Sequence, residues 1–248
     1  MEHLGAEGWE RLVLDEHRED VTEMSRRIRA GYVDGLVKPI LVETEPGWRV
    51  LETGSGWASL TATLALNGRL VAAMDWSSQI VAKGLALFES CQVGGEGVCA
   101  DLFAALPFAD NSYDCIWSSG VLEHFDRDNQ VRILRESARV ARRKVISLIP
   151  NSLSLAYRLG KWQMERRGSW EFGYEKPERS QRSIFEAAGL VNIRETSADA
   201  ARAAWFLKVF GEENWSQRAW RRLGRKAPGL MEKAVRQGYM LVTVGDVA

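Results

Sequence analysis

Residues 50–59, with the sequence VLETGSGWAS, decide the fold of this chain. Aliphatic residues lead into two closely spaced glycines, Gly54 and Gly56, a pattern that is typical of a buried strand, a tight turn and the start of a helix. Glycines let the backbone of such a turn approach a ligand, which the first amide groups of the helix would face. The stretch therefore predicts a ligand site at the carboxyl end of a strand.

Two carboxylates are expected beside this turn. Glu52 lies two residues before the first glycine, where it would meet the ammonium group of a bound amino acid. Asp75 closes the next apolar run, residues 70–74, at a place suited to accepting hydrogen bonds from ribose hydroxyls. The turn alone also suits a dinucleotide-binding domain, although Ser59 stands where the third glycine of that fingerprint would fall.

With these features the chain resembles the class I S-adenosylmethionine-dependent methyltransferases. Their first motif, hydrophobic-Glu-x-Gly-x-Gly, matches residues 51–56, and their second, an acidic strand end, matches Asp75. The resemblance covers residues 50–190 and extends to the last strand, and it implies S-adenosylmethionine as the cofactor. The cofactor-binding residues that it implies are Glu52, Gly54, Ser55, Gly56, Asp75, Trp76, Asp101, Leu102, Ser118 and Gly120.

The later positions of this set have expected roles in the family pattern. Trp76 would pack against adenine, or it would belong to the core. Asp101 would accept the exocyclic amine of adenine while the backbone amide of Leu102 meets a ring nitrogen, although Asp101 alone also reads as a turn or cap residue. Ser118 and Gly120, at the end of the fourth strand, would contact the methionine moiety through their backbone.

Uninterrupted apolar runs alternating with helical patterns predict a doubly wound, mostly parallel, seven-stranded sheet of the Rossmann-like methyltransferase type. The expected strands are residues 48–52, 70–74, 97–100, 113–118, 145–149, 190–195 and 239–244. By resemblance, the last strand is expected to be antiparallel and at the sheet edge. The expected helices after the glycine turn are residues 58–67, 79–90, 127–142 and 180–188.

We expect a single methyltransferase domain over residues 1–248. Residues 1–45 would form two helices that cover the site, and residues 48–149 would form the cofactor-binding core. Residues 151–178, which are aromatic and punctuated by glycine, would form a lid over the strand ends. The C-terminal half, residues 180–248, would carry a second helical insertion.

That second insertion, residues 197–237, contains three tryptophans and a cluster of basic residues. A solvated helix face and a site for an anionic substrate or surface both explain such a cluster. The residues concerned are Trp205, Trp215, Trp220, Arg218, Arg221, Arg222, Arg225 and Lys226.

The sequence says less about the residues that would bind the methyl acceptor than about those that would bind the cofactor. His124 follows the fourth strand in the phrase Leu-Glu-His, where it would orient or deprotonate the acceptor, or where it or Glu123 would cap the next helix. Tyr32 and Tyr174 are candidate substrate contacts, with packed aromatic side chains as the alternative. Some family members use such a Glu-His pair in a divalent-metal site, but no other clear ligand is visible in the sequence, so no metal is expected.

Composition limits the partners. The 33 basic and 33 acidic residues give a formal net charge of 0, so no overall charge attracts nucleic acid, and no nucleic-acid partner is expected. The charged N-terminus and the absence of an apolar run of about 18 residues predict a cytoplasmic protein without a membrane span. Cys91, Cys99 and Cys115 lack metal-ligand spacing and are expected to be buried free thiols.

We therefore predict a methyltransferase that uses S-adenosylmethionine and a small-molecule acceptor, with O-, N- and C-methylation left open. The thioether that leaves a sulfonium is neutral, so positioning and exclusion of water can supply much of the catalysis. The alternatives are an NAD(P)-dependent oxidoreductase, which Ser59 and the closeness of Glu52 to a pyrophosphate disfavour, and a non-catalytic protein that binds S-adenosylmethionine.

Overall fold

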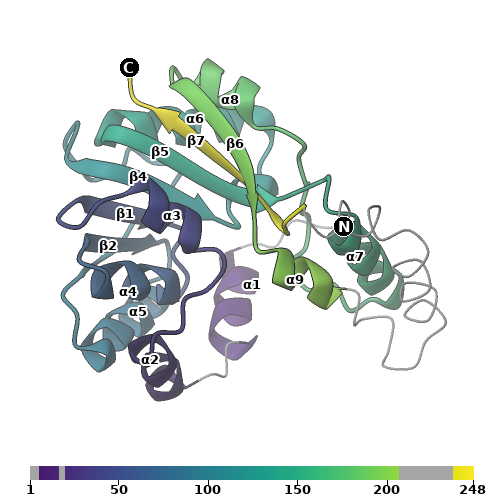
Figure 1. Ribbon diagram of the computed structural model, residues 1–248, viewed down its shortest axis with the longest axis horizontal. Coiled ribbons are helices and arrows are strands. Elements are labelled where there is room, and N and C mark those ends of the chain that lie inside the picture. Colours follow the sequence, from purple (N-terminus) through teal and green to yellow (C-terminus); the bar gives the residue numbers. More distant parts are fainter. Residues whose placement is uncertain (1–5, 17–19, 207–236) are drawn as a thin grey trace.

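The computed structural model of the chain describes residues 6–16, 20–206 and 237–248. Its centre is one seven-stranded sheet with the order β3-β2-β1-β4-β5-β7-β6 (Figure 1). The strands are β1 (Arg49–Thr53), β2 (Leu70–Asp75), β3 (Glu96–Cys99), β4 (Tyr113–Ser119), β5 (Ala141–Pro150), β6 (Val191–Ala198) and β7 (Met240–Asp246). The first five strands pair in parallel and β7 pairs antiparallel, so the predicted fold class is confirmed.

The position of β7 corrects one expectation. This strand pairs with both β5 and β6 and therefore lies inside the sheet, and β6 forms the edge. Burial explains the order, because the first six residues of β7 are all buried whereas β6 buries only two of its eight. The interior strand of a sheet covered on both faces must be apolar on both sides, and β6 is too polar for that place.

The helices fall into the pattern of a doubly wound sheet. They are α1 (Ala6–Arg11), α2 (Val21–Arg29), α3 (Lys38–Glu43), α4 (Ser59–Leu66), α5 (Ser78–Cys91), α6 (Arg127–Val140), α7 (Leu155–Arg167), α8 (Arg182–Ala187) and α9 (Ala200–Trp205), with a π-helical turn η1 (Leu12–Glu16) and a 3₁₀ turn η2 (Leu122–His124). None of the helices in the described part of the chain is long and apolar enough to cross a membrane.

The segment before the sheet holds more helices than the two that the sequence suggested. Helix α1 continues into η1, and α2 and α3 follow. Asp20 begins α2 by accepting a hydrogen bond from the Thr22 amide, and Gly31, with φ of 89°, ends it. A proline in the first turn of α3 then starts a new helix.

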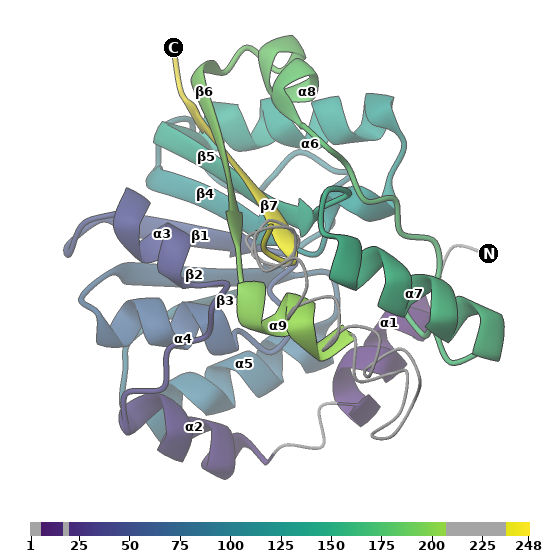
Figure 2. The ribbon, with the colours of Figure 1, turned by 45° about the vertical axis from the view of Figure 1, so that its right-hand side comes forward.

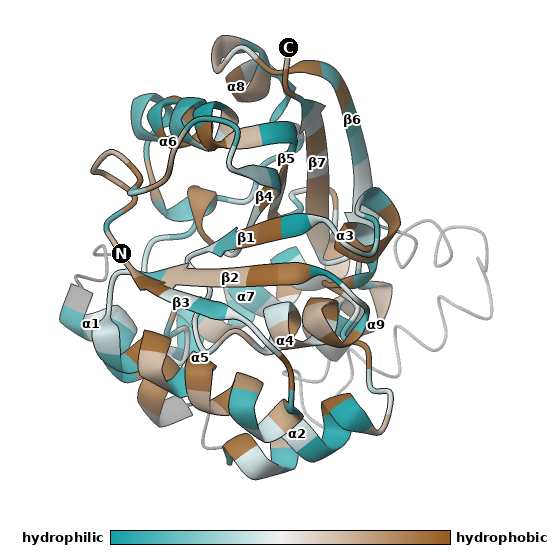
Figure 3. Cartoon of the chain, turned by 90° about the vertical axis from the view of Figure 1, so that its left-hand side faces the viewer, coloured by the Kyte–Doolittle hydropathy of each residue, from teal (hydrophilic) through white to brown (hydrophobic). Residues whose placement is uncertain are grey.

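Two apolar layers hold the sheet between the helices. On one face, Val50 of β1 joins Ile28 of α2 and Leu87 of α5 in one cluster. On the other face, the adjacent Leu51 joins a second cluster that includes Phe185 of α8. Figure 3 shows β2 and β7 as largely apolar ribbons between these helices. The alternation of neighbouring strand residues between two cores is what fixes the register of the sheet.

Strand β5 begins earlier than expected. The sequence suggested a helix as far as residue 142, but the strand starts at Ala141 and includes Arg142 and Arg143. Both guanidinium groups pair with the buried carboxylate of Asp114 at the start of β4, at 2.5 and 3.0 Å. These ion pairs stabilise Arg142 and Arg143 within a strand, although their polarity made a strand unexpected there.

The three cysteines are free, as expected, and Cys91 and Cys115 are buried. Cys99 is exposed, so the expectation that all three are buried is wrong. The reason is that β3 is the other edge strand and leaves its residues partly or fully exposed.

The insertion at residues 151–178 starts and finishes at the carboxyl end of β5. The amide of Glu178 donates to Pro150 at 3.1 Å, and the amide of Ser152 donates to Glu178 at 2.9 Å. Between these bonds the chain forms α7 and an irregular loop, residues 168–178, which we call the strap. Figures 1 and 2 show α7 and α1 near the same end of the sheet. The basic cluster and tryptophans of the second insertion, apart from Trp205 at the end of α9, lie outside the described residues.

Candidate functional site

The glycine turn joins β1 to α4 and is held by β2. Gly54 and Gly56 both have positive φ angles, 67° and 51°, which L side chains rarely adopt. The amide of Ser55 donates to the Met74 carbonyl at 3.0 Å, and the amide of Gly56 donates to the Asp75 carboxylate at 3.0 Å. Asp75, the acidic strand end, therefore shapes the turn directly.

Glu52 lies beneath this turn rather than on its surface. Its side chain is 3% exposed and accepts a hydrogen bond from the hydroxyl of Thr61 in α4. Burial raises the pKa of Glu52 to about 8, and the neighbouring Asp75 adds to the rise. A carboxyl group in this position is mostly neutral at pH 7 and becomes a carboxylate when a cation comes next to it.

Trp76 directly follows the carboxyl end of β2. Its side chain is 40% exposed, which excludes the alternative that it belongs to the core. The carboxylate of Asp101 accepts a hydrogen bond from the Phe103 amide at 2.8 Å, so it does cap its own turn. Leu102 is partly buried and packs on the cluster around α6. These three side chains follow the carboxyl ends of β2 and β3, where the family pattern expects adenine.

The end of β4 contributes Ser118, Gly120 and the turn η2. Ser118 is buried, and Gly120 has φ of 73°. The amide of Gly120 donates to the Leu148 carbonyl of β5 at 3.0 Å, so its carbonyl is the group left for a ligand contact. A Cβ placed on Gly120 would be 3.8 Å from Oε1 of Glu123, which puts this carboxyl group beside the strand end.

Helix α1 and η1 lie across these strand ends. Trp9 packs edge-on against the ring of His124, with 4.6 Å between the ring centroids. Glu10 accepts hydrogen bonds from Ser77 and Gln79, and a Cβ on Gly56 would be 3.9 Å from Val13. Helix α1 and η1 therefore contact the region where the N-terminal cover was expected, and their covering of a bound ligand stays a prediction.

Tyr32 is held elsewhere. The Arg27 guanidinium lies 4.4 Å from the centroid of its ring, and its hydroxyl is 3.4 Å from Asp34. Its ring is 41% exposed, so the alternative of a core aromatic is wrong, and its contact with a substrate stays a prediction.

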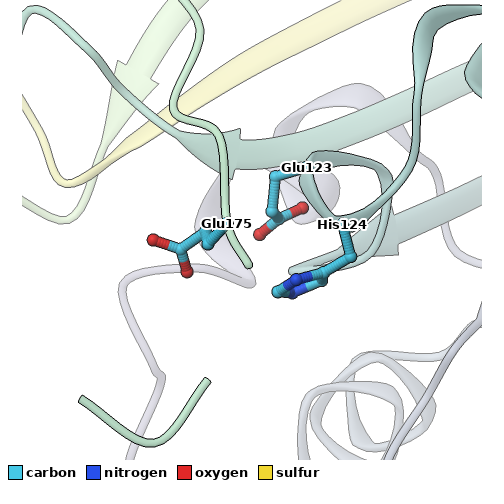
Figure 4. Close-up of side chains that lie close together, drawn as sticks. All are labelled: Glu123, His124 and Glu175. Atoms are coloured by element: carbon cyan, nitrogen blue, oxygen red, sulfur yellow. The ribbon is translucent and has the colours of Figure 1, made fainter. Parts of the chain in front are cut away.

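Three ionisable side chains meet at η2 (Figure 4). The Nδ1 of His124 is 2.6 Å from the Tyr174 carbonyl, which can only accept, so Nδ1 carries the hydrogen and the lone pair of the neutral ring is on Nε2. Glu123 is 1% exposed, and its Oε2 has no hydrogen-bond partner among the described residues. Glu175 accepts from the hydroxyl of buried Tyr157. One ligand atom from each of Glu123, His124 and Glu175 lies within 4.8 Å of the others.

Burial sets the protonation of these carboxyl groups. It raises the pKa of Glu123 well above its ordinary value, and the negative charge of Glu175 raises it further. Burial also raises the pKa of Glu175, although the hydrogen bond from Tyr157 opposes the rise. A cation bound between the two would reverse these shifts.

This cluster corrects two sequence interpretations. The next helix is capped by Asp126, which accepts from the Asn129 amide at 2.9 Å, so neither Glu123 nor His124 is the cap. Glu175 is a third possible metal ligand beside the Glu-His pair, which the sequence did not reveal because Glu175 arrives on the strap. One of the two glutamates in the aromatic phrase WEFGYEKP, residues 170–177, was the one available signal.

Residues 51–149 match the family model of the methyltransferase domain. The chain contains a methyltransferase domain and is an S-adenosylmethionine-dependent methyltransferase, as predicted. Its cofactor is S-adenosylmethionine, and the match decides against the nicotinamide-dependent alternative. No curated protein sequence matches the methyltransferase.

Solved structures share its fold. One is from the complex between the Haloferax volcanii Trm112 methyltransferase activator and a methyltransferase, with a TM-score of 0.58, 16% identity and coverage of 97% of this chain and 95% of that one. Another is magnesium protoporphyrin IX methyltransferase from Synechocystis PCC 6803 with S-adenosylhomocysteine, with a TM-score of 0.56, 19% identity and coverage of 98% and 94%. At these identities the likeness establishes the fold.

The residues of the glycine turn fit the cofactor of the methyltransferase. The inner side of Gly56 is open apart from Val13, the Asp75 carboxylate stands at the strand end, and Trp76 offers an exposed ring. When bound, S-adenosylmethionine supplies an electrophilic methyl group. The role of each cofactor-binding residue in holding it stays a prediction.

The two glycines of the turn are expected to differ in their effect on stability. A Cβ at Gly54 would lie 2.5 Å from a methyl group of Val121, whereas at Gly56 the nearest atom is 3.9 Å away. We expect Gly54→Ala to lower the free energy of unfolding by about 2–4 kcal/mol, from backbone strain plus overpacking, and Gly56→Ala by about 1 kcal/mol from strain alone. Urea unfolding measures both, and equal losses would contradict this account of the turn.

Cofactor affinity is expected to depend on pH through Glu52. Below a pKa of about 8, one proton must leave Glu52 before a carboxylate can pair with the cofactor ammonium. The affinity for S-adenosylhomocysteine should therefore rise by up to roughly tenfold per pH unit between pH 5.5 and 7.5. Calorimetry should show this slope in the wild type and a flat profile in Glu52→Gln. The same raised pKa means that the cofactor-free protein loses stability as pH rises from 4.5 toward 8.

Proposed function

We propose that the methyltransferase transfers a methyl group to a small-molecule acceptor that binds between α1 and the strap, beside His124. The observation that carries this proposal is the double cover over the strand ends. Trp9 from α1 packs on one side of the His124 ring, and the Tyr174 carbonyl from the strap bonds to the ring nitrogen. Two covers over one side chain favour a compact acceptor over a folded protein or a duplex.

The cofactor-binding residues have complementary parts in this proposal. Asp75 binds the ribose hydroxyls, and the carboxylate of Glu52 binds the ammonium of the methionine moiety. The carbonyl of Gly120 and the buried Ser118 position that moiety next to η2. Because the strap and α1 exclude water, the chain mainly positions the two reactants, and His124 accepts a proton where the acceptor carries one.

Some of the proteins with this fold act on small molecules. Besides the protoporphyrin enzyme, the fold occurs in a Haemonchus contortus phosphoethanolamine N-methyltransferase, with a TM-score of 0.56, 17% identity and coverage of 96% of this chain and 59% of that one. These relatives support a small acceptor as a class without identifying it.

Two measurements test the proposed function. Calorimetry with S-adenosylmethionine, S-adenosylhomocysteine and NAD should show binding of the first two ligands alone. Methyl-labelled S-adenosylmethionine is then incubated with metabolite extract, with total protein and with total RNA. Label in the metabolite fraction supports the proposal, and label confined to protein or RNA overturns it. Binding without transfer to any fraction indicates the non-catalytic alternative.

The strap and α1 are expected to become more protected when the cofactor site is filled. Hydrogen exchange with and without S-adenosylhomocysteine should slow in α1 and in residues 168–178, because both segments contact η2 or the glycine turn. Helix α8, on the far side of the α6 layer, is the internal control and should not change. Equal exchange in both segments with and without ligand would contradict their role as covers.

A further inference from the structure

Among the described residues, the strongest unexplained feature is a pair of buried carboxyl groups that no cation pairs with. Glu123 is 1% exposed and Glu175 is 8% exposed. No Lys or Arg among the described residues forms an ion pair with either of them. Lys161 acts on Glu175 from a distance, but its ammonium is 2.6 Å from Glu165 and lies over the Trp170 ring. Two buried acids with no paired base stay protonated or need a ligand that supplies the positive charge.

One of these buried carboxyl oxygens also lacks a hydrogen-bond partner among the described residues. Oε2 of Glu123 has no hydrogen-bond partner in the described part of the chain, although nearly all buried polar atoms in proteins have one. Figure 4 shows the Glu123 carboxyl group between Glu175 and the His124 ring. The same group lies beside Gly120 at the end of β4. The unpaired carboxyl oxygen of Glu123 therefore lies on the side of the proposed site that would bind the methyl acceptor.

The spacing of the cluster suits a nitrogen donor. A tetrahedral nitrogen that donates hydrogen bonds of about 2.8–2.9 Å holds its acceptors about 4.7 Å apart. The ligand atoms of Glu123, His124 and Glu175 all lie within 4.8 Å of one another, a limit that an amine bound between the two carboxyl groups satisfies. A metal ion with bonds of about 2.0–2.2 Å would hold its ligand atoms about 3–3.5 Å apart, which the same limit also allows.

We propose that Glu123 and Glu175 bind the nitrogen of an amine acceptor and that the methyltransferase is an N-methyltransferase. This inference rests on the proposed function and narrows its substrate class. Aromatic side chains lie beside the cluster, with Trp9 against the His124 ring and the hydroxyl of Tyr157 bonded to Glu175. A primary or secondary amine with a compact apolar body fits such a site, since aromatic faces attract cations and bury apolar groups.

The balance of charge in the reaction supports an amine over an oxygen acceptor. The ammonium form gives one proton to the His124 imidazole, and the freed lone pair forms the nitrogen–carbon bond. The carbon–sulfur bond breaks with its electron pair left on sulfur, so the positive charge moves from sulfur to nitrogen. Two carboxylates beside that nitrogen stabilise the charge as it develops. The same carboxylates would repel a phenolate, a carboxylate or a phosphate acceptor.

The test uses the full chain with methyl-labelled S-adenosylmethionine and a metabolite extract. Labelled products are separated on a cation exchanger at pH 7 and the methylated atom is identified by mass spectrometry. We expect the label on nitrogen, in products that the exchanger retains. Label on oxygen or carbon overturns the amine inference and leaves the proposed function standing, whereas no labelled metabolite overturns the proposed function itself.

Variants and a binding measurement connect the products to the cluster. Glu123→Gln and Glu175→Gln keep the side-chain shape and should lower transfer to the amine at least tenfold, while S-adenosylhomocysteine affinity stays within about twofold. Glu178→Gln is the matched control, because this acid is also on the strap but pairs with Lys176 at 2.8 Å. In calorimetry with S-adenosylhomocysteine present, the unlabelled amine should lose at least tenfold affinity in the first two variants and none in the control.

Unchanged amine affinity in both Glu123→Gln and Glu175→Gln would overturn the assignment. Adding a chelator to the transfer assay distinguishes binding of an amine from binding of a metal ion. Transfer that survives EDTA supports amine binding by the carboxylates, and transfer that EDTA abolishes and Mn²⁺ restores shows a metal ion in their place, which overturns the inference.

Discussion

Replacing Asp75 with alanine is expected to weaken binding of S-adenosylhomocysteine by about 1–3 kcal/mol, which is roughly five- to 150-fold. Two losses add in this variant. The ribose hydroxyls lose a charged acceptor, and the Gly56 amide loses the carboxylate that it bonds to at 3.0 Å. A second oxygen of Asp75 is 3.4 Å from the Ser77 amide, so the start of α5 is also affected.

Two further variants separate these contributions in calorimetry. Asp75→Asn keeps a carbonyl oxygen for the Gly56 amide but lacks the charge, so it should fall between the wild type and alanine. Asp114→Asn removes another buried acid, at the opposite end of the sheet, where it binds Arg142 and Arg143. That control should lower the unfolding temperature without changing ligand affinity. Wild-type affinity in Asp75→Ala would remove Asp75 from the cofactor site.

The fold was predictable because local sequence patterns indicate most of its strands and helices. Seven strand-like runs correspond to the seven strands, and capping residues near them mark real boundaries, as Ser77 does at the start of α5. The order of the last two strands was not predictable in this way. A strand's neighbours depend on packing between distant segments, and only the greater burial of β7 compared with β6 distinguishes them.

The two halves of the candidate site differ in the same respect. The residues expected to bind the cofactor stand at or just after the ends of adjacent parallel strands, so chain order alone brings Glu52, Asp75 and Ser118 to one edge of the sheet. The acceptor side depends on contacts across long sequence separations. Trp9 and Glu175 reach His124 from α1 and from the strap, and no period or motif in the sequence connects them.

His124→Gln is expected to lower the rate of methyl transfer by about tenfold or more, at the low end of the roughly 10²–10⁴ that general acid-base catalysis contributes, with little change in cofactor affinity. The structure gives a reason for the choice of variant. Nδ1 of His124 donates to the Tyr174 carbonyl at 2.6 Å, and the amide group of glutamine can keep a hydrogen bond to the strap. What glutamine cannot do is accept a proton.

The pH profile makes this prediction specific to proton transfer. A neutral imidazole is needed as the base, so the wild-type rate should fall toward low pH as imidazole gains its proton, and His124→Gln should lose that limb of the profile. Trp9→Phe is the positioning control, because it alters the edge-on contact with the His124 ring and leaves the ring's ability to titrate. Its rate should fall less, and its acidic limb should persist. If His124→Gln keeps both the wild-type rate and the wild-type profile, the histidine serves only to hold the strap, and catalysis depends on positioning by the two covers.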